Sequence, residues 1–137
     1  MYSLTFCTKN RKKIFINPEA VKIVQTELEK VSNNKRWNIE VYCFMPDHLH
    51  ILVSPQQDEV DLISFVSLFK QKSGFLYKQK TGQYLWQKSY HDHALRSDED
   101  LFDVARYILE NPQRAKIVDN WREYPFLGSF IHNIDDL

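Results

Sequence analysis

Two histidines that lie close together are the residues of this sequence best placed to do chemistry. His48 and His50 stand in the run His48–Val53, which otherwise shows the apolar alternation of a β-strand. Side chains on a strand alternate between its two faces, so both imidazoles project from one side of the sheet. Two neutral imidazoles on one rigid strand supply half of the ligand set of a divalent metal ion. The same pair also fits two surface or hydrogen-bonded histidines, so the pattern alone leaves both interpretations open.

A tyrosine and an asparagine form a second candidate pair, near the end of a predicted helix. The apolar stripe of that helix repeats at helical spacing and comprises Leu101, Val104, Ala105 and Ile108. At about 100° per residue, Tyr107 and Asn111 fall together on the flank of this stripe, one turn apart. Their phenol and amide oxygens can therefore reach one small site. The structural alternative is a tyrosine beside a buried stripe and an asparagine that ends the helix before Pro112.

Strands and helices alternate along the chain in an order that can position these side chains. Period-two alternation predicts strands over residues 2–7, 37–44, 48–53 and 85–95. Capping residues and helical periodicity predict helices that begin at Asn17-Pro18, at Asp58 or Asp61, and at Ser97 to Asp100; the second runs to about Lys80 and the third to Asn111-Pro112. We therefore expect an α+β fold, with a ferredoxin-like four-stranded antiparallel sheet, helices on one face and a C-terminal tyrosine-bearing helix.

The predicted strand over residues 37–44 pairs with the histidine strand as a hairpin, through the tight connection Met45-Pro46-Asp47. Alternation predicts that Trp37, Ile39, Val41 and Cys43 share one face and Asn38, Glu40, Tyr42 and Phe44 the other. Cys7 and Cys43 show no metal spacing, so we expect reduced thiols in or near the core. Four aromatic residues are candidates to stack on unpaired bases, although such residues on strands are more often core: Trp37, Phe44, Trp86 and Tyr90.

Length and composition indicate one soluble domain. The 137 residues predict a single domain over 1–137, with a short aromatic tail over about 119–137. No apolar run reaches the roughly 18 residues of a membrane span and the N-terminus shows no signal peptide, so we expect a cytoplasmic protein without a membrane partner. The 18 basic and 18 acidic residues cancel and provide no overall field to attract nucleic acid.

Several short sequence motifs, in the order in which they occur, resemble those of one family. They are Leu4-Thr5-Phe6 with Asn10-Arg11-Lys12, then Met45 to Val53, Leu85-Trp86-Gln87, Tyr90 to Arg96, Arg106 to Pro112 with Ala115, and Tyr124-Pro125. Over nearly its whole length the chain is similar to the single-tyrosine HUH transposases, and most like the REP-associated tyrosine transposases.

This resemblance implies cleavage and rejoining of single-stranded DNA at or near a hairpin, by a homodimer. It implies that His48, His50 and Asn111 hold a divalent ion, Mg²⁺ or Mn²⁺, against the scissile phosphate. Tyr107 would attack to give a 5′-phosphotyrosine and a free 3′-hydroxyl. The candidates for DNA contact are Lys9, Arg11, Lys12, Lys70, Arg96 and Arg106, and the candidates to support the metal ligands are Asp47, His91 and His93.

Two other functions stay compatible with the sequence. One is a domesticated DNA-binding module without transposition activity. The other is a metal-dependent phosphoesterase in which water attacks and Tyr107 is structural. Replacement of Tyr107 by Phe distinguishes the phosphoesterase from the strand transferase, because hydrolysis by water survives that change and covalent strand transfer does not.

Overall fold

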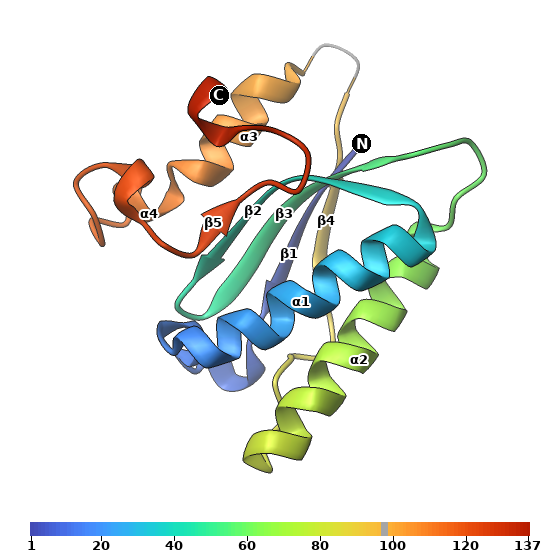
Figure 1. The fold of residues 1–137 in the computed structure, drawn as a ribbon, viewed down its shortest axis with the longest axis vertical. Helices are drawn as coiled ribbons and strands as arrows, with labels where there is room; N and C mark the ends of the chain where they lie inside the picture. The colour runs from blue at the N-terminus through green and yellow to red at the C-terminus, as the bar shows by residue number, and fades with distance from the viewer. Residues whose placement is uncertain (97–98) are drawn as a thin grey trace.

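A five-stranded antiparallel sheet forms the centre of the protein, with strand order β4-β1-β3-β2-β5 (Figure 1). The computed structural model describes residues 1–96 and 99–137. The strands and helices are β1 (Tyr2–Cys7), α1 (Pro18–Lys35), β2 (Trp37–Met45), β3 (His48–Pro55), α2 (Leu62–Thr81), β4 (His91–Ala94), α3 (Leu101–Leu109), α4 (Asn111–Arg114) and β5 (Leu127–Gly128). Short 3-10 helices are η1 (Lys9–Arg11), η2 (Ile14–Ile16), η3 (Trp121–Glu123) and η4 (Ile134–Asp136). The α+β architecture is the one expected, with β5 added at one edge.

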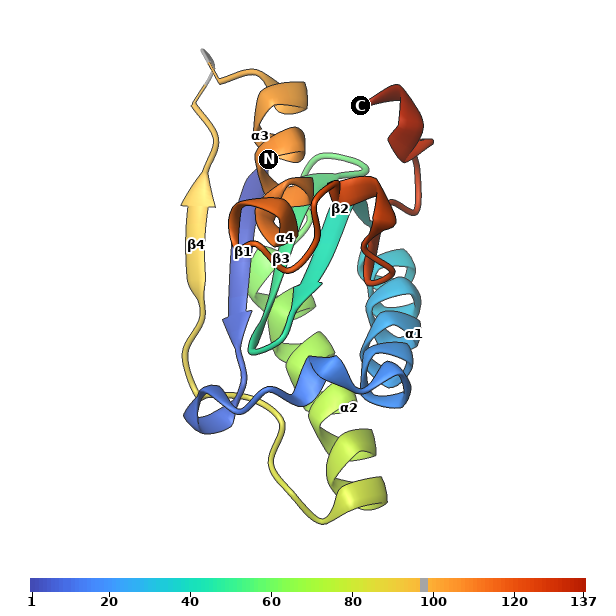
Figure 2. The same ribbon diagram turned by 90° about the vertical axis from the view of Figure 1, so that its left-hand side faces the viewer.

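Helices α1 and α2 pack side by side on one face of the sheet (Figures 1 and 2). Asn17 caps α1, because its side chain accepts a hydrogen bond from the Glu19 amide at 3.0 Å, as predicted. Asp61 caps α2 in the same way, and Gly82 ends it in the left-handed conformation at φ 76°. The core between these helices and the sheet contains Leu4, Phe6, Val24, Leu28, Phe44, Leu49, Ile51, Val53, Phe65 and Phe69, all fully buried.

A second core lies on the opposite face of the sheet, beneath α3 and the C-terminal segment. Ala105 and Ile108 of α3 are buried there, as the apolar stripe predicted, and Leu101 and Val104 of the same stripe are partly buried against this core. Leu109, which was not part of the predicted stripe, is buried as well. They pack with buried sheet residues and with three residues of the tail: Val41, Cys43, Met45, Leu52, Trp121, Tyr124 and Leu127. Both faces of β2 and β3 are therefore covered, and the histidine strand is held from two sides.

The predicted faces of β2 are wrong beyond Ile39. In the β2–β3 register, Ile39 lies opposite Val53 and Val41 lies opposite Leu52, so Glu40 is an extra residue and the alternation shifts by one. Tyr42 and Phe44 consequently face α1, while Val41 and Cys43 face α3. The Glu40 carboxylate is buried and accepts a hydrogen bond from Ser54 Oγ at 2.6 Å. A buried, hydrogen-bonded side chain thus stabilises the bulge.

The segment before α3 also differs from the prediction. Regular pairing is confined to His91–Ala94, and of the earlier residues Trp86 forms an isolated bridge with Thr8. Lys70 holds this segment by donating to the carbonyl oxygens of Gln87, at 2.8 Å, and Lys88, at 3.0 Å. The side-chain acceptor at the start of α3 is Asp100, 2.8 Å from the Phe102 amide. The expected hydroxyl cap, Ser97, lies outside the described residues.

Helix α3 ends at Leu109, two residues before the predicted end, and a separate turn, α4, starts at Asn111. Pro112 explains the break, because proline has no N–H to donate to a carbonyl in the preceding turn but fits the first turn of a new helix.

Both cysteines are buried free thiols, as expected. Among the helices of the described residues, none combines the length and apolar character needed to cross a membrane.

Candidate active site

A cavity of about 370 Å³ lies between α3 and the sheet, on the face of β3 that carries the histidines. Figure 2 shows α3 beside β1 and β4 at one end of the sheet. The residues that line the cavity are Ser3, His50, His93, Glu99, Asp103, Val104, Tyr107 and Ile108. The structure therefore brings His50 and Tyr107 to one cavity, although they are far apart in the sequence.

His50 is the more enclosed of the two histidines. It lies opposite Thr5 of β1 and Cys43 of β2, and its Nε2 shares a hydrogen bond of 2.8 Å with Ser3 Oγ. Burial, with smaller contributions from the charges of His48 and Arg114, lowers the pKa of His50 to about 4. The imidazole is therefore neutral at pH 7, which is the form that binds a metal ion.

His48 is oriented by a chain of polar contacts. Its Nδ1 lies 2.8 Å from Asp47 Oδ1, and Asp47 Oδ2 accepts a hydrogen bond from Arg11 Nε at 3.0 Å. Burial raises the pKa of Asp47, but the hydrogen bonds from His48 and Arg11 outweigh it and hold this pKa below its ordinary value. A carboxylate on Nδ1 selects the tautomer and leaves Nε2 available, as in many metal-binding histidines.

Tyr107 is 60% exposed and is covered by an arginine. The Arg114 guanidinium carbon lies 3.7 Å from the centre of the Tyr107 ring, and Arg114 Nη2 donates to the Tyr107 carbonyl oxygen at 2.6 Å. The break at Pro112 turns the chain so that Arg114, on α4, reaches back to α3. The tyrosine is thus fixed beside a permanent positive charge.

The donors present fit a divalent ion held by imidazole, amide oxygen and water. Within residues 1–96 and 99–137, no group of three His, Cys, Asp or Glu side chains is close enough to hold a metal ion. The histidine pair therefore needs an amide oxygen or water to complete a coordination shell. Asn111, the first residue of α4, is half-buried and stands one turn beyond Tyr107. A neutral His50 and a His48 oriented by Asp47 suit the two imidazole positions.

The family described as "Transposase IS200 like" matches residues 1–111. The chain belongs to this family. A protein of Haemophilus influenzae assigned as a REP-associated tyrosine transposase is 23% identical over 137 residues, which cover 92% of this chain and 77% of the relative.

Two solved structures share the fold of this IS200-like transposase. A REP-associated tyrosine transposase bound to a REP hairpin matches with a TM-score of 0.78 and 20% identity, over 92% of this chain and 74% of that chain. A structure described as a transposase from Deinococcus radiodurans R1 matches with a TM-score of 0.61 and 22% identity, over 80% of this chain and 88% of that chain.

The other predicted site residues of the transposase lie in several places. His91 and His93 on β4 pair with Thr5 and Ser3 of β1, which places them on the same face of the sheet as His50. His93 lines the cavity, and its Nε2 lies 3.0 Å from Glu99 Oε1. Of the candidates for DNA contact, Lys70 is engaged by backbone carbonyls, Arg96 lies near Glu99, and Arg106 pairs with Glu110 at 3.0 Å; Lys9 and Lys12 are exposed.

The aromatic residues considered for base stacking are mostly used by the core. Trp37 and Phe44 are buried, so they cannot meet a base. Trp86 donates from Nε1 to Ser73 Oγ, and Tyr90 stacks on Phe6 with ring centres 5.6 Å apart.

Sequence reasoning missed Ser3, Asp103 and Arg114. Strand alternation places Ser3 on the histidine face, and helical spacing places Asp103 one turn before Tyr107, so both carried a usable signal. For Arg114 there was none, because its contact with Tyr107 depends on the turn at Pro112.

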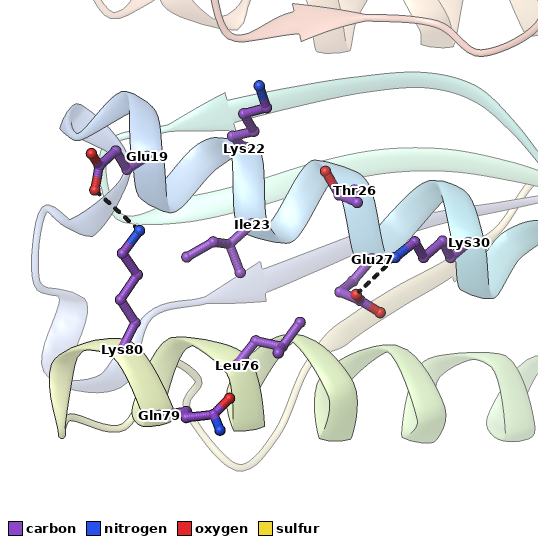
Figure 3. A pocket seen from close by; sticks show the side chains of 9 residues that line it. All are labelled: Glu19, Lys22, Ile23, Thr26, Glu27, Lys30, Leu76, Gln79 and Lys80. Carbon is purple, nitrogen blue, oxygen red and sulfur yellow. Dashed lines mark ion pairs between the residues drawn. The ribbon is translucent and has the colours of Figure 1, made fainter.

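A larger cavity, of about 520 Å³, lies between α1 and α2 on the opposite side of the sheet (Figure 3). Its carboxylates are paired, Glu19 with Lys80 at 3.4 Å and Glu27 with Lys30 at 3.9 Å. Its lining has neither a histidine nor a tyrosine. The smaller cavity beneath α3 is therefore the candidate active site.

Proposed function

We propose that this protein is a metal-dependent single-stranded DNA endonuclease and strand transferase, which acts at hairpin-bearing DNA through a 5′-phosphotyrosine intermediate. The observation that carries the proposal is that Tyr107 of α3 and His50 of β3 line one cavity. Membership of the IS200-like transposase family supports the same chemistry.

In this proposal Tyr107 is the nucleophile. Its phenol loses a proton to solvent, and the phenolate oxygen forms a bond to phosphorus while the bond from phosphorus to the 3′-oxygen breaks. The leaving oxygen takes up a proton and becomes a free 3′-hydroxyl. Because the phosphodiester energy is kept in the tyrosyl ester, a second 3′-hydroxyl can reverse the step and join strands.

Arg114 and the histidines prepare the site for this step. The Arg114 guanidinium carbon lies 3.7 Å from the centre of the Tyr107 ring, and its positive charge beside the tyrosine favours binding of the phosphate. His48, His50 and Asn111 would hold a divalent ion, Mg²⁺ or Mn²⁺. When bound, that ion supplies positive charge to the phosphate oxygens.

The proposed substrate is a DNA hairpin with unpaired flanking nucleotides. Support comes from the REP-associated tyrosine transposase that shares this fold and was solved with a REP hairpin. A homodimer, implied by the family resemblance, is part of the proposal and is tested by sedimentation with and without DNA.

Labelled single-stranded hairpin DNA incubated with the protein and Mn²⁺ tests the proposal on denaturing gels. The wild type should yield a cleaved strand and a slow protein–DNA adduct, and EDTA should abolish both. Tyr107→Phe and His48→Ala should yield neither. Cleavage by the Tyr107→Phe variant would show that water, and not Tyr107, attacks the phosphate. Binding without cleavage by the wild type would leave a DNA-binding module.

A further inference from the structure

Basic and acidic residues are segregated along this chain, although their numbers are equal. Residues 1–18 contain four Lys and Arg and no acid, and residues 62–91 contain five Lys and no acid. These two segments thus carry nine of the chain's 18 basic residues. A net charge of zero therefore conceals a strong local positive charge wherever the two segments meet.

The structure brings the two segments together beyond the end of β1. The Lys9 amide donates to the Leu85 carbonyl at 2.9 Å, and the Gln87 amide donates to the Cys7 carbonyl at 3.0 Å. The loop after β1 and the segment after α2 accordingly lie at the same end of the molecule (Figures 1 and 2). We call the exposed residues Lys9, Arg11, Lys12, Lys78 and Tyr84 the basic corner.

Tyr84 is the aromatic residue between α2 and β4 that the core does not use. Its side chain is 65% exposed, whereas Trp86 and Tyr90 pack against Phe6. The Lys78 ammonium lies 4.1 Å from the centre of the Tyr84 ring. Lys78, with a smaller contribution from Lys9, lowers the pKa of the Tyr84 phenol. An exposed ring among lysines is the combination by which proteins bind unpaired bases together with their phosphates.

The basic corner begins next to the proposed cleavage site. Along β1, Thr5 pairs with His50, Cys7 pairs with His48, and Thr8 bridges to Trp86. The three residues from Thr5, at the level of His50, to Thr8 span about 10 Å of extended chain, and Lys9, the first residue of the corner, follows directly. Arg11 also connects the corner to His48 through Asp47. A single DNA strand that leaves the histidines along β1 would reach Tyr84 within a few nucleotides.

We propose that the basic corner binds a short single-stranded DNA tract that continues from the proposed cleavage site. Tyr84 stacks on an unpaired base of this tract, and Lys9, Lys12 and Lys78 contact its phosphates. A duplex does not fit this description, because its bases are stacked on one another and offer no free face to Tyr84. The inference rests on the proposed function for the position of the tract.

Binding measurements in a Tyr107→Phe background test the proposal without cleavage. One DNA is a hairpin with a single-stranded flank, and the second is the same hairpin without the flank. Tyr84→Ala should weaken binding of the flanked hairpin about tenfold, and leave the affinity for the blunt hairpin unchanged. Tyr84→Phe, which keeps the ring, should bind like the parent protein. The control is Phe75→Ala on α2, also 65% exposed, which should change neither affinity.

Salt dependence measures the phosphate contact of Lys78, and base fluorescence measures the stacking of a base on Tyr84. Lys78→Gln should reduce the slope of log affinity against log salt for the flanked hairpin by about 0.7, the value for one phosphate of a single strand. Lys30→Gln, at a side chain 70% exposed on α1, is the matched control and should keep the slope. A 2-aminopurine in the flank should be quenched by the parent protein and not by Tyr84→Ala.

The outcomes distinguish this inference from the proposed function. Equal affinity for flanked and blunt hairpins, or a Tyr84→Ala variant that binds the flanked hairpin like its parent, overturns the inference and leaves the cleavage proposal intact. Flank binding that depends on Tyr84, in a wild-type protein that never cleaves DNA, supports the inference and overturns the cleavage proposal.

Discussion

His50 makes the folding stability of this protein depend on pH. Its pKa is about 4 in the folded protein, against 6.5 as its ordinary value. Between these pH values the unfolded chain binds more protons, so acidification favours unfolding. We expect the His50 contribution to the free energy of unfolding to fall from pH 6.5 to pH 4, by at most about 3 kcal/mol.

Urea denaturation of metal-free protein at pH 7 and pH 4.5 measures this effect. In His50→Gln the loss of stability between the two pH values should be smaller than in the wild type, because one titrating group is gone. An equal loss in both proteins would show that His50 is not held neutral by the fold.

We propose that Asp47 supports His48 as a metal ligand, besides its place in the turn between β2 and β3. It is the residue that fixes Nδ1 of His48, at 2.8 Å. We expect Asp47→Ala to weaken Mn²⁺ binding about 10- to 100-fold, as measured by titration calorimetry. Asp119→Ala, at an exposed position, is the control and should bind the metal as the wild type does. If Asp47→Ala bound Mn²⁺ as tightly as the wild type, Asp47 would have no role in metal binding.

At the scale of elements, the docking of α3 determines whether Tyr107 reaches the histidines. Ile108 is fully buried between α3 and the sheet. Ile108→Ala should lower the free energy of unfolding by about 2–5 kcal/mol, and also reduce the yield of the protein–DNA adduct. Phe102→Ala, on the same helix but at a residue 55% exposed, should have little effect on stability. Similar losses in both variants would argue against the packing described for α3.

The elements that sequence predicted well are those set by local patterns. Helix caps at Asn17 and Asp61, the stop at Gly82 and the faces of β1 and β3 depend on residues near one another in the chain. The bulge at Glu40 was not predictable in this way, because its stabilising partner Ser54 comes from another strand. Strand β5 has two residues and is defined by its pairing with β2. It is too short to show the alternation of apolar and polar residues from which a strand is predicted.

In the candidate site, too, local patterns predicted some features, while others depend on tertiary structure. Spacing alone predicted that His48 and His50 share a face, and the register of β3 confirms it. That Tyr107 shares a cavity with His50 is a tertiary fact, which the family resemblance implied and periodicity did not. The contacts of Arg114 and Tyr84 could not be predicted from local patterns. Arg114 reaches the Tyr107 ring because of the turn at Pro112, and Tyr84 lies among lysines because two segments distant in sequence meet.

At the scale of the whole molecule, two cores share one sheet. Trp37 belongs to the core beneath α1 and α2, and Trp121 to the core beneath α3. Because β2 contributes to both cores, we expect one cooperative transition. Variants that keep either Trp37 or Trp121 as the single tryptophan should give coincident fluorescence midpoints with urea. Separate midpoints would show that the α3 layer can detach while the rest stays folded.

The most direct test of the central claim is to find the covalent bond itself. Hairpin DNA, Mn²⁺ and protein are incubated, the adduct is digested with nuclease and trypsin, and the peptides are analysed by mass spectrometry. Cleavage after Arg106 and Arg114 releases the peptide Tyr107–Arg114. The proposed mechanism predicts a nucleotide joined to this peptide at Tyr107 through its 5′-phosphate. A nucleotide on any other residue, or cleaved DNA without a modified peptide, would contradict the assignment of Tyr107 as the nucleophile.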